Sequence, residues 1–340
     1  MTKSKVTTAL IVGLGSIGKR HLRLLKEINP QLKIIALTRK ALKKSNNNID
    51  NYVSNIKEAI SFNPEIAIIS NPSSLHLKYS IPLVESGTHL LIEKPISASS
   101  KNVDKLIDLA KRKKIKLTVG YNLRFLKSLN FFRKRILDKT IGKIYSVRSE
   151  VGQHLRDWRP NSDYRQGVSA QRKLGGGVLL ELSHEIDYLT WIFGSVKSVT
   201  GYINKLSDLE IDVEDLAHCF LSFKGIPSGQ EVQATLNMDF IRKDPIRQCT
   251  VIGEKGTLNW DGIKNKVTIF NDKEGWKLIY GQEEDIDLSY RAQLIHFLDC
   301  VENDKEPMIT GISAMETLKV IEAIKKSSKK KKFIEIDHLI

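Results

Sequence analysis

A chain of 340 residues with 41% hydrophobic and 27% charged side chains has the composition of an ordinary globular protein and room for two domains, without low-complexity tracts or solenoid repeats. It contains no apolar run of about 18 residues, so we expect neither a membrane span nor a signal peptide. The net charge of +15 would suit a nucleic acid or an anionic membrane, but no basic helix, stacking aromatics or zinc finger accompanies the densest basic run, Lys329–Lys332, and we expect a solvated turn there and neither partner.

The first part of the chain alternates apolar runs with amphipathic helical stretches, which is typical of a parallel sheet with helices on both faces. We therefore predict a doubly wound α/β domain over residues 1–122. Its predicted strands are Thr7–Val12, Lys33–Leu37, Ile66–Ser70, Leu90–Ile92 and Lys116–Val119. Its predicted helices are Ser16–Ile28, Leu75–Glu85 and Asn102–Lys111.

Residues 123–340 show a different pattern and form the second predicted domain. It begins with one or two helices, an irregular loop at Gly152–Gly175 and a helix at Gly177–Phe193. Alternating apolar and polar segments then predict a large, open, mainly antiparallel sheet. These segments include Val196–Asn204, Ala217–Phe223, Glu231–Phe240 and Gln248–Ile252. Helices at Asp287–Cys300 and Ser313–Ser327 and a short strand at Phe333–Ile336 close the chain, and spacing alone does not say which domain these helices join.

Three cysteines, Cys219, Cys249 and Cys300, stand far apart and form no Cys-x-x-Cys pair. This spacing indicates neither a disulfide framework nor a zinc site. We therefore expect a reducing, cytoplasmic compartment and no metal.

Gly13, Gly15 and Gly18 form the pattern Gly-x-Gly-x-x-Gly directly after the first predicted strand, where the first predicted helix opens. In that context the first two glycines allow a tight turn and close approach to a pyrophosphate, and the third allows helix and strand to pack. The helix N-terminus offers N–H donors to the phosphates. We expect a dinucleotide site that includes Ser16 and Ile17; the alternative is a glycine-rich turn without a ligand.

The end of the second predicted strand bears on the choice between NAD and NADP. An acidic residue there would bond the ribose 2′-hydroxyl of NAD, but this chain has Thr38, followed by Arg39 and Lys40. A hydroxyl and a guanidinium suit a 2′-phosphate. We therefore favour NADP over NAD, with two solvent-facing basic residues as the alternative.

Lys94 lies in the tripeptide Glu93-Lys94-Pro95, directly after the predicted strand Leu90–Ile92. This is the carboxyl end of a parallel strand, where open α/β sheets place their ligand crevice. A lysine there would donate to a substrate oxygen during hydride transfer. Taken alone, Lys94 would more often be a surface lysine.

Four motifs in this order resemble a known family. They are the glycine pattern, Glu93-Lys94-Pro95, Gly120-Tyr121-Asn122-Leu123-Arg124-Phe125, and Gly175-Gly176-Gly177 followed by His184 and Asp187. Over nearly its whole length the chain resembles the glucose–fructose oxidoreductase, inositol dehydrogenase and rhizopine-catabolism family. The resemblance implies a Rossmann domain, an α/β domain whose open sheet mediates oligomers, here a homodimer or homotetramer, and a catalytic role for Lys94.

The resemblance also implies that His184 is the general acid/base. The family usually has an aspartate four residues before this histidine, whereas this chain has Leu180 there and Glu181 three residues before it. On one continuous helix Glu181 and His184 would project from the same side, so Glu181 would orient the imidazole or contact substrate. Asp187 would support the helix. A partly buried structural histidine is the alternative for His184.

Further residues complete the expected sites. Asn122 and Arg124 follow the last Rossmann strand and would contact substrate or cofactor, although a hinge-stabilising ion pair explains Arg124 equally well. Arg156, Trp158 and Arg165, in the loop before the glycine run, suit a sugar with an anionic group, or equally a subunit contact. The expected cofactor site also includes Asn71, Pro72, His76, Glu93 and Lys94.

Together these features predict an NAD(P)-dependent oxidoreductase that transfers a hydride between nicotinamide and a sugar-like alcohol or ketone. A nucleotide-linked or acidic sugar of surface-polysaccharide synthesis is the finer expectation. One alternative is a dehydrogenase of a non-sugar substrate, such as a dihydrodiol or a tetrapyrrole. The other is a non-catalytic dinucleotide sensor, which would not need both Lys94 and His184.

Overall fold

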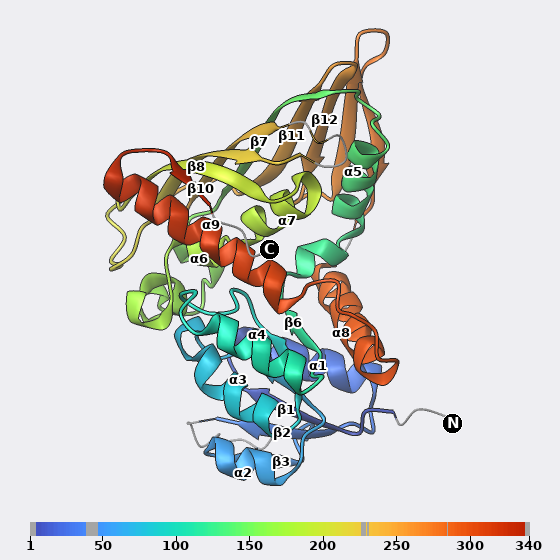
Figure 1. The fold of residues 1–340 in the computed structure, drawn as a ribbon, viewed down its shortest axis with the longest axis vertical. Coiled ribbons are helices and arrows are strands. Elements are labelled where there is room, and N and C mark those ends of the chain that lie inside the picture. Colours follow the sequence, from blue (N-terminus) through green and yellow to red (C-terminus); the bar gives the residue numbers. More distant parts are fainter. Residues whose placement is uncertain (1–4, 39–46, 226–228, 230, 284, 337–340) are drawn as a thin grey trace. The chain divides into compact units, whose positions relative to one another are not determined.

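The computed structural model describes the chain except residues 1–4, 39–46, 226–228, 230, 284 and 337–340 (Figure 1). Its contacts divide the chain into two compact units. The first combines Met1–Asn122 with Asp287–Met315, and the second combines Leu123–Ile286 with Glu316–Ile340. Helix α8 (Ile286–Glu302), which spacing left unassigned, thus lies almost wholly in the first unit. Helix α9 (Gly311–Lys330) begins in the first unit and continues in the second.

A six-stranded parallel sheet forms the centre of the first unit, in the order β3-β2-β1-β4-β5-β6. This is the Rossmann order, and it confirms the predicted doubly wound fold. The predicted sheet lacked only the short β3, whose sequence Asn-Tyr-Val has no apolar run. The strands are β1 (Thr8–Val12), β2 (Lys33–Leu37), β3 (Asn51–Val53), β4 (Ile66–Ile69), β5 (His89–Ile92) and β6 (Leu117–Val119).

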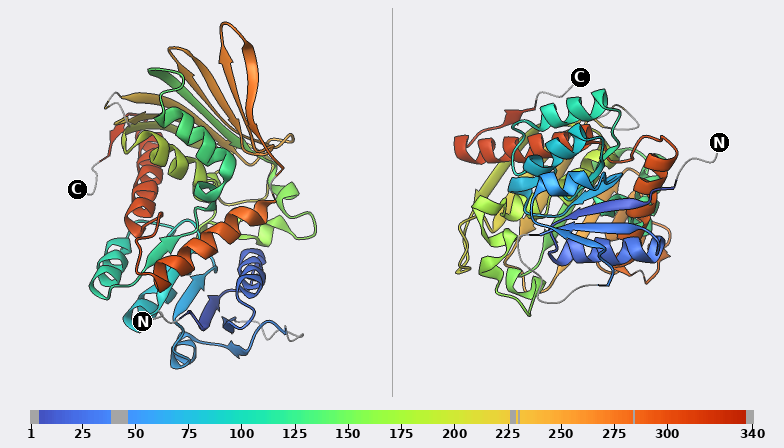
Figure 2. Two further views of the ribbon diagram at one scale, coloured as in Figure 1. Left: turned by 90° about the vertical axis from the view of Figure 1, so that its right-hand side faces the viewer. Right: turned by 90° about the horizontal axis from the view of Figure 1, so that it is seen from below.

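Helices cover both faces of this sheet, because its central strands are apolar on both sides. On one face α1 (Ser16–Ile28) and α8 share a core with β1, to which α8 adds Leu294 and Phe297. The other face is covered by α2 (Ile56–Ser61), α3 (His76–Glu85) and α4 (Val103–Arg112) (Figure 2). Predicted and observed bounds of α1 agree.

A nine-stranded sheet dominates the second unit, in the order β14-β13-β12-β11-β7-β10-β9-β8-β15. Only the β7–β10 pair of this described sheet is parallel, so the predicted open, mainly antiparallel sheet is confirmed. Strands β7 and β12–β14 were not among the predicted segments. The strands are β7 (Ile144–Gly152), β8 (Val196–Asn204), β9 (Leu216–Phe223), β10 (Val232–Asp239), β11 (Ile246–Gly253), β12 (Gly256–Asp261), β13 (Lys266–Asn271), β14 (Gly275–Gly281) and β15 (Ile334–Glu335).

Helices pack on one face of this sheet (Figure 2). They are α5 (Lys127–Leu137), α6 (Val178–Glu181), α7 (His184–Phe193) and α9. The single helix predicted at Gly177–Phe193 is wrong: the chain bends at Leu182 and Ser183 between α6 and α7. At the bend the Glu185 N–H donates to the Leu182 carbonyl three residues back, a tighter turn than the α-helical four-residue bond.

Buried polar contacts fix α7 on the sheet. Glu185 is fully buried and accepts from Arg247 Nε on β11 at 2.7 Å. The hydroxyls of Tyr188 and Ser149 on β7 lie 2.6 Å apart. Just before α5, Arg124 donates twice to Asp187, at 2.7 and 2.9 Å. Because one side chain of each of these pairs lies on α7, the contacts fix how the helix is rotated about its own axis relative to the sheet, beginning at His184.

The three cysteines are free and buried. Burial raises the pKa of the Cys219 thiol to about 12, and it also raises the pKa of Cys249 and of Cys300. At neutral pH all three are therefore protonated and poor nucleophiles. In the described ranges, no helix combines the length and apolar character that a membrane span requires.

Replacing Arg124 by Met should destabilise the second unit, because it leaves Asp187 buried without its cation. We expect a loss of about 3–5 kcal/mol in unfolding free energy near pH 7.5. Burial raises the pKa of Asp187 and Arg124 opposes that rise, so the Arg124→Met change raises the pKa further. A group with a raised pKa binds its proton better in the folded state, so the loss should shrink as the pH falls toward 5.

Urea unfolding of wild type and Arg124→Met at several pH values measures this loss. The variant Arg133→Met is the matched control, because Arg133 packs over Trp191 but has no carboxylate partner among the described contacts. An Arg124→Met loss that grows on acidification would contradict the assignment of the destabilisation to Asp187.

Candidate functional site

The glycine motif forms a tight turn between β1 and α1. Gly13 has φ +95°, a left-handed conformation that favours glycine, and its N–H donates to the carbonyl of Leu37 at 3.0 Å. A Cβ on Gly13 would lie 3.0 Å from the Asn71 nitrogen. The turn therefore needs glycine at this position, as predicted.

Gly18 allows the closest packing in the motif. A Cβ there would lie 2.0 Å from the Gly13 carbonyl oxygen and 2.7 Å from Ser70 Oγ. Ser70 donates to the same carbonyl at 2.8 Å, so helix α1, the turn and the end of β4 meet at one oxygen. Ser70 was not predicted from the sequence, because its contact with Gly13 depends on strand order.

Gly15 differs from the other two glycines. Its φ is −70°, which any residue adopts, and a Cβ built on it meets no described atom within 4 Å. Neither conformation nor internal crowding explains a glycine here. It stands at the N-cap of α1, directly before Ser16 and Ile17, where a missing side chain lets a phosphate approach the helix N–H groups. This open position fits a dinucleotide pyrophosphate.

Asn71 lies beside this turn, at the carboxyl end of β4. Both polar atoms of its amide are shielded from solvent, and neither has a hydrogen-bond partner within the described part of the chain. Buried polar groups nearly always have partners. An amide left over beside the glycine turn therefore also fits the expected cofactor, and Pro72 follows it as the N-cap of a short 3-10 turn.

His76, also expected at the cofactor, is buried against the backbone of the chain. It is 1% exposed; Nδ1 lies 3.0 Å from the Pro95 carbonyl oxygen, and Nε2 lies 2.8 Å from that of Asn71. Burial lowers the pKa of His76, which favours the neutral ring. Both ring nitrogens thus contact this chain's own backbone, so His76 supports two loops at the sheet edge.

Thr38 directly follows the last residue of β2, and its N–H donates to the Val53 carbonyl at 3.2 Å. It is half-buried. Arg39 and Lys40, on which the preference for NADP depends, lie outside the described residues. The choice of dinucleotide therefore stays a prediction.

Lys94 is half-buried within a run, Leu91–Ser97, whose other members are all buried. It follows β5 directly, at the carboxyl edge of the parallel sheet, and its bond to Pro95 is cis. Glu93, expected at the cofactor, is 7% exposed. One of its oxygens lies 2.7 Å from His21 Nε2, and the other accepts from the Lys94 N–H at 3.2 Å. Glu93 thus contacts its own chain.

In the second unit, Glu181 and His184 are the two half-buried residues in an otherwise buried run, Val178–Leu189. His184 opens α7 after Ser183, while Glu181 ends α6 and accepts from Ser169 Oγ at 2.6 Å. The expectation that both project from one continuous helix is wrong, because the bend separates them. Ser169 was not identified from sequence, since it lies in the preceding loop.

Arg124 and Asn122 are both buried, and each donates hydrogen bonds within its own unit. Arg124 is 5% exposed and forms the double hydrogen bond with Asp187, which is 1% exposed. Asn122 donates to Ser289 Oγ on α8 at 2.8 Å. The ion-pair alternative therefore accounts for Arg124, and Asp187 is its partner. The expected contacts of both residues with substrate or cofactor stay predictions.

The loop residues expected at substrate differ in how they are held. The Trp158 indole donates to the Gln153 carbonyl at 3.1 Å and stacks edge-on against Phe240. Arg165 is paired with Asp163 and Glu210, so its charge is already neutralised. Arg156 lies over the Tyr164 ring, 5.6 Å from its centroid, and no carboxylate contact is described for it.

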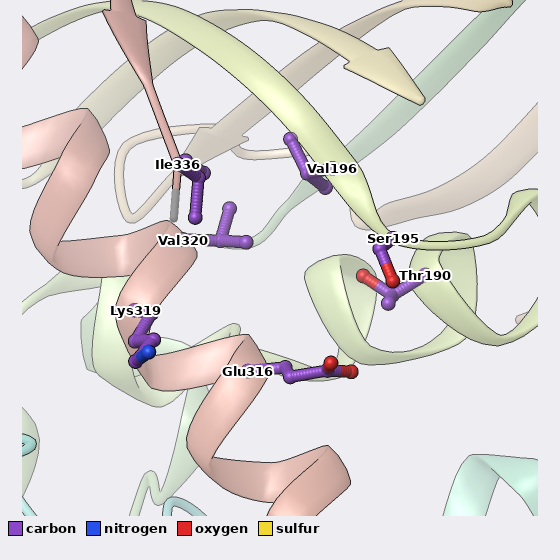
Figure 3. A pocket seen from close by; sticks show the side chains of 7 residues that line it. All are labelled: Thr190, Ser195, Val196, Glu316, Lys319, Val320 and Ile336. Atoms are coloured by element: carbon purple, nitrogen blue, oxygen red, sulfur yellow. The ribbon is translucent and has the colours of Figure 1, made fainter. Parts of the chain in front are cut away.

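A small cavity of the second unit lies between α7, β8 and α9 (Figure 3). It has room for about one water molecule, so it is too small for a sugar or a dinucleotide. Across the described ranges, no three His, Cys, Asp or Glu side chains group closely enough to hold a metal ion. The cavity is lined by Thr190, Ser195, Val196, Glu316, Lys319, Val320 and Ile336.

Two family descriptions match the chain in tandem. Residues 7–121 match the NAD-binding Rossmann fold of an oxidoreductase family, and residues 133–336 match the C-terminal α/β domain of the same family. The chain belongs to this oxidoreductase family. It is the glucose–fructose oxidoreductase, inositol dehydrogenase and rhizopine-catabolism family indicated by the sequence motifs, so the resemblance is confirmed.

Relatives in this family include characterised dehydrogenases. Myo-inositol 2-dehydrogenase of Thermotoga maritima is 25% identical over 349 residues, covering 97% of this chain and 98% of that protein. An uncharacterized oxidoreductase of Synechocystis sp. is 26% identical over 216 residues, covering 60% of this chain and 56% of that protein.

Solved structures share the fold at lower identity. Levoglucosan dehydrogenase in complex with NADH has a TM-score of 0.85 at 16% identity, covering 98% of this chain and 100% of that one. The WlbA dehydrogenase of Bordetella pertussis with NADH and UDP-GlcNAcA has a TM-score of 0.81 at 20% identity, covering 98% and 99%.

The two glycines Gly15 and Gly18 should respond oppositely to alanine. Gly15→Ala meets open space, so we expect an unchanged melting temperature and NADH or NADPH affinity lowered at least ~10-fold, because a methyl group occupies the path of the pyrophosphate. Gly18→Ala clashes with the Gly13 carbonyl, so we expect a loss of about 1–3 kcal/mol in stability.

Thermal unfolding and quenching of intrinsic fluorescence by the dinucleotide measure the two effects. Gly87→Ala is the control for strain, because Gly87 has φ +94° but nothing within 4 Å of a Cβ and lies outside the motif. Normal dinucleotide affinity in a folded Gly15→Ala variant would contradict the assignment.

Proposed function

We propose that this protein transfers a hydride between an NAD(P) nicotinamide and a CH–OH or keto group of a sugar-like substrate. The observation that carries the proposal is the state of Lys94: a half-buried lysine among buried neighbours, at the carboxyl edge of a sheet whose glycine turn fits a dinucleotide. When bound, the nicotinamide supplies or accepts the hydride. The remaining chemistry is proton transfer at the substrate oxygen, which falls to the chain's own residues.

We assign Lys94 to the reacting oxygen and His184 to its proton. The Lys94 ammonium donates a hydrogen bond that stabilises negative charge on the oxygen as the hydride moves. An imidazole exchanges protons readily near neutral pH, so His184 removes the proton in oxidation and returns it in reduction. Glu181, held by Ser169, is assigned to a substrate hydroxyl.

The substrate class we propose is an acidic or nucleotide-linked sugar. Arg156 has no described carboxylate contact and is thus available to an anionic group, whereas Arg165 is paired within its own loop. Trp158 offers a ring to a sugar face. The structural neighbour with UDP-GlcNAcA supports this class, and the inositol and levoglucosan dehydrogenases support a neutral polyol as the second candidate.

We further infer a cytoplasmic homodimer or homotetramer. The three buried free thiols suit a reducing compartment. The face of the large sheet opposite its helices carries exposed apolar side chains, which favours contact with another copy of the chain. These side chains are Tyr202, Phe220, Trp276 and Leu278.

Lys94→Ala and His184→Ala should each lower kcat at least ~100-fold, because each removes one of the two groups assigned to the substrate oxygen and its proton. Dinucleotide affinity should stay within about 2-fold of wild type, because neither change alters the glycine turn. The assay follows NAD(P)H absorbance with UDP-linked uronic acids, free uronic acids, inositols and neutral hexoses as candidate substrates. Lys101→Ala, at a nearby exposed lysine, is the control. Full turnover in Lys94→Ala or His184→Ala would refute the assigned role.

The dinucleotide preference should follow the basic residues after β2. We propose a higher kcat/KM with NADP than with NAD, and a reversal of this preference in Arg39→Asp, because a carboxylate repels the 2′-phosphate and bonds the 2′-hydroxyl. Steady-state kinetics with both dinucleotides checks it, with Lys33→Asp at the exposed start of β2 as the control. A wild-type preference for NAD would contradict the choice of NADP.

A further inference from the structure

Two buried histidines that the proposed chemistry does not use lie on either side of the Lys94–Pro95 dipeptide. His21 is 0% exposed and contacts Glu93, the residue before Lys94. His76 is 1% exposed and contacts the carbonyl of Pro95, the residue after it. Ring nitrogens of buried side chains thus contact the residues directly before and after Lys94.

The contact with His21 is the more specific of the two. His21 Nε2 lies 2.7 Å from Glu93 Oε1, so the ring N–H donates to a buried carboxylate. Glu93 Oε2 accepts from the Lys94 N–H at 3.2 Å. A buried carboxylate is costly unless it is hydrogen-bonded, so these two donors determine where it lies.

Packing removes other positions for the Glu93 carboxylate. Gly120, after β6, lies so close that a Cβ on it would be 2.9 Å from Glu93 Oε2. The Gly120 N–H donates to Ile92, and the Glu93 N–H donates to Ile69, so strands β4, β5 and β6 hold this site together. The rings of Tyr290 and His21 pack in an edge-to-face arrangement, with an interplanar angle of 79° and centroids 5.9 Å apart. This contact fixes the plane of the His21 ring.

His21 also connects this site to the glycine motif, since it lies on α1 three residues after Gly18. The geometry points to His21 and Glu93 as positioning residues for Lys94: the His21 N–H fixes the Glu93 carboxylate, and that carboxylate fixes the Lys94 backbone relative to helix α1. This inference rests on the proposed function of Lys94. Neither His21 nor Glu93 is assigned a contact with substrate.

The experiment uses the full-length protein and follows Lys94 directly. Acetic anhydride labels lysine amines, and mass spectrometry of peptides gives the labelling rate of Lys94 relative to Lys101 without substrate or dinucleotide. His21→Leu removes the donor, and His21→Gln retains an N–H near the position of Nε2. We expect the relative Lys94 rate to change at least ~3-fold in His21→Leu and to return to near wild type in His21→Gln, because geometry at this site depends on the donor.

Kinetics provides the second measurement. We expect His21→Leu to lower kcat ~10–100-fold while NAD(P)H affinity stays within about 2-fold, since a small displacement of a reacting group costs rate more than binding. The matched control is His89→Leu. His89 is a half-buried histidine at the opposite end of the same strand β5, where Nδ1 accepts from the Lys116 N–H at 2.9 Å. The His89→Leu variant should be less stable than wild type, but its Lys94 labelling should be unchanged.

Glu93→Leu provides a test that leaves His21 in place. It removes both acceptor oxygens, so neither the His21 N–H nor the Lys94 N–H keeps its partner, and Lys94 labelling should change as in His21→Leu. Unchanged labelling in a folded Glu93→Leu variant, or a His21→Leu effect no larger than that of His89→Leu, would overturn the inference. Full turnover in Lys94→Ala would refute the proposed function instead, and the labelling would still report whether His21 positions Lys94.

Discussion

A carboxylate buried in the protein interior must find a cation or a hydrogen-bond donor, and this requirement shapes both candidate catalytic regions. Glu93 precedes Lys94 and is held by His21. Asp187 and Glu185 follow His184 and are held by Arg124 and Arg247. In each region a half-buried functional side chain is a near neighbour of buried acids whose partners come from distant parts of the sequence. The positions of Lys94 and His184 therefore depend on the hydrogen-bond and ion-pair partners of the buried acids that lie near them in sequence.

The second constraint is close approach of backbone to backbone at the glycine turn. Gly18 brings α1 to within contact of the Gly13 carbonyl, and Ser70 donates to that same oxygen from the end of β4. Gly13 meets Asn71 on the next loop. Of the three motif glycines, Gly15 alone faces open space. The three glycines thus divide into two that serve packing and one that leaves room for a ligand.

Features that depend on neighbours in sequence were accessible from the sequence. The strand β1, the turn, helix α1 and the position of Lys94 after β5 follow from apolar patterning and glycine chemistry within a few residues. The buried pairs were not accessible: His21 with Glu93 is separated by 72 residues and Arg124 with Asp187 by 63. The bend before His184 was not predicted, because neither Leu182 nor Ser183 is a helix-breaking residue such as glycine or proline. The alternatives for Asn122 and Arg124 stayed open at the sequence level, because a polar residue after a strand looks the same whether it faces a ligand or a buried partner.

Helix α8 gives the first unit an unusual relation to chain order. Leu294 and Phe297 complete the core against β1 and α1, yet they follow Leu22 and Leu25 by more than two hundred and sixty residues. During synthesis the Rossmann strands emerge first, but one face of their sheet is covered only by α1 until α8 is made, after most of the second unit. Folding from the N-terminus therefore cannot finish one unit before starting the next. The part of this core that α8 covers remains exposed to chaperones, or to other nascent chains, for most of translation.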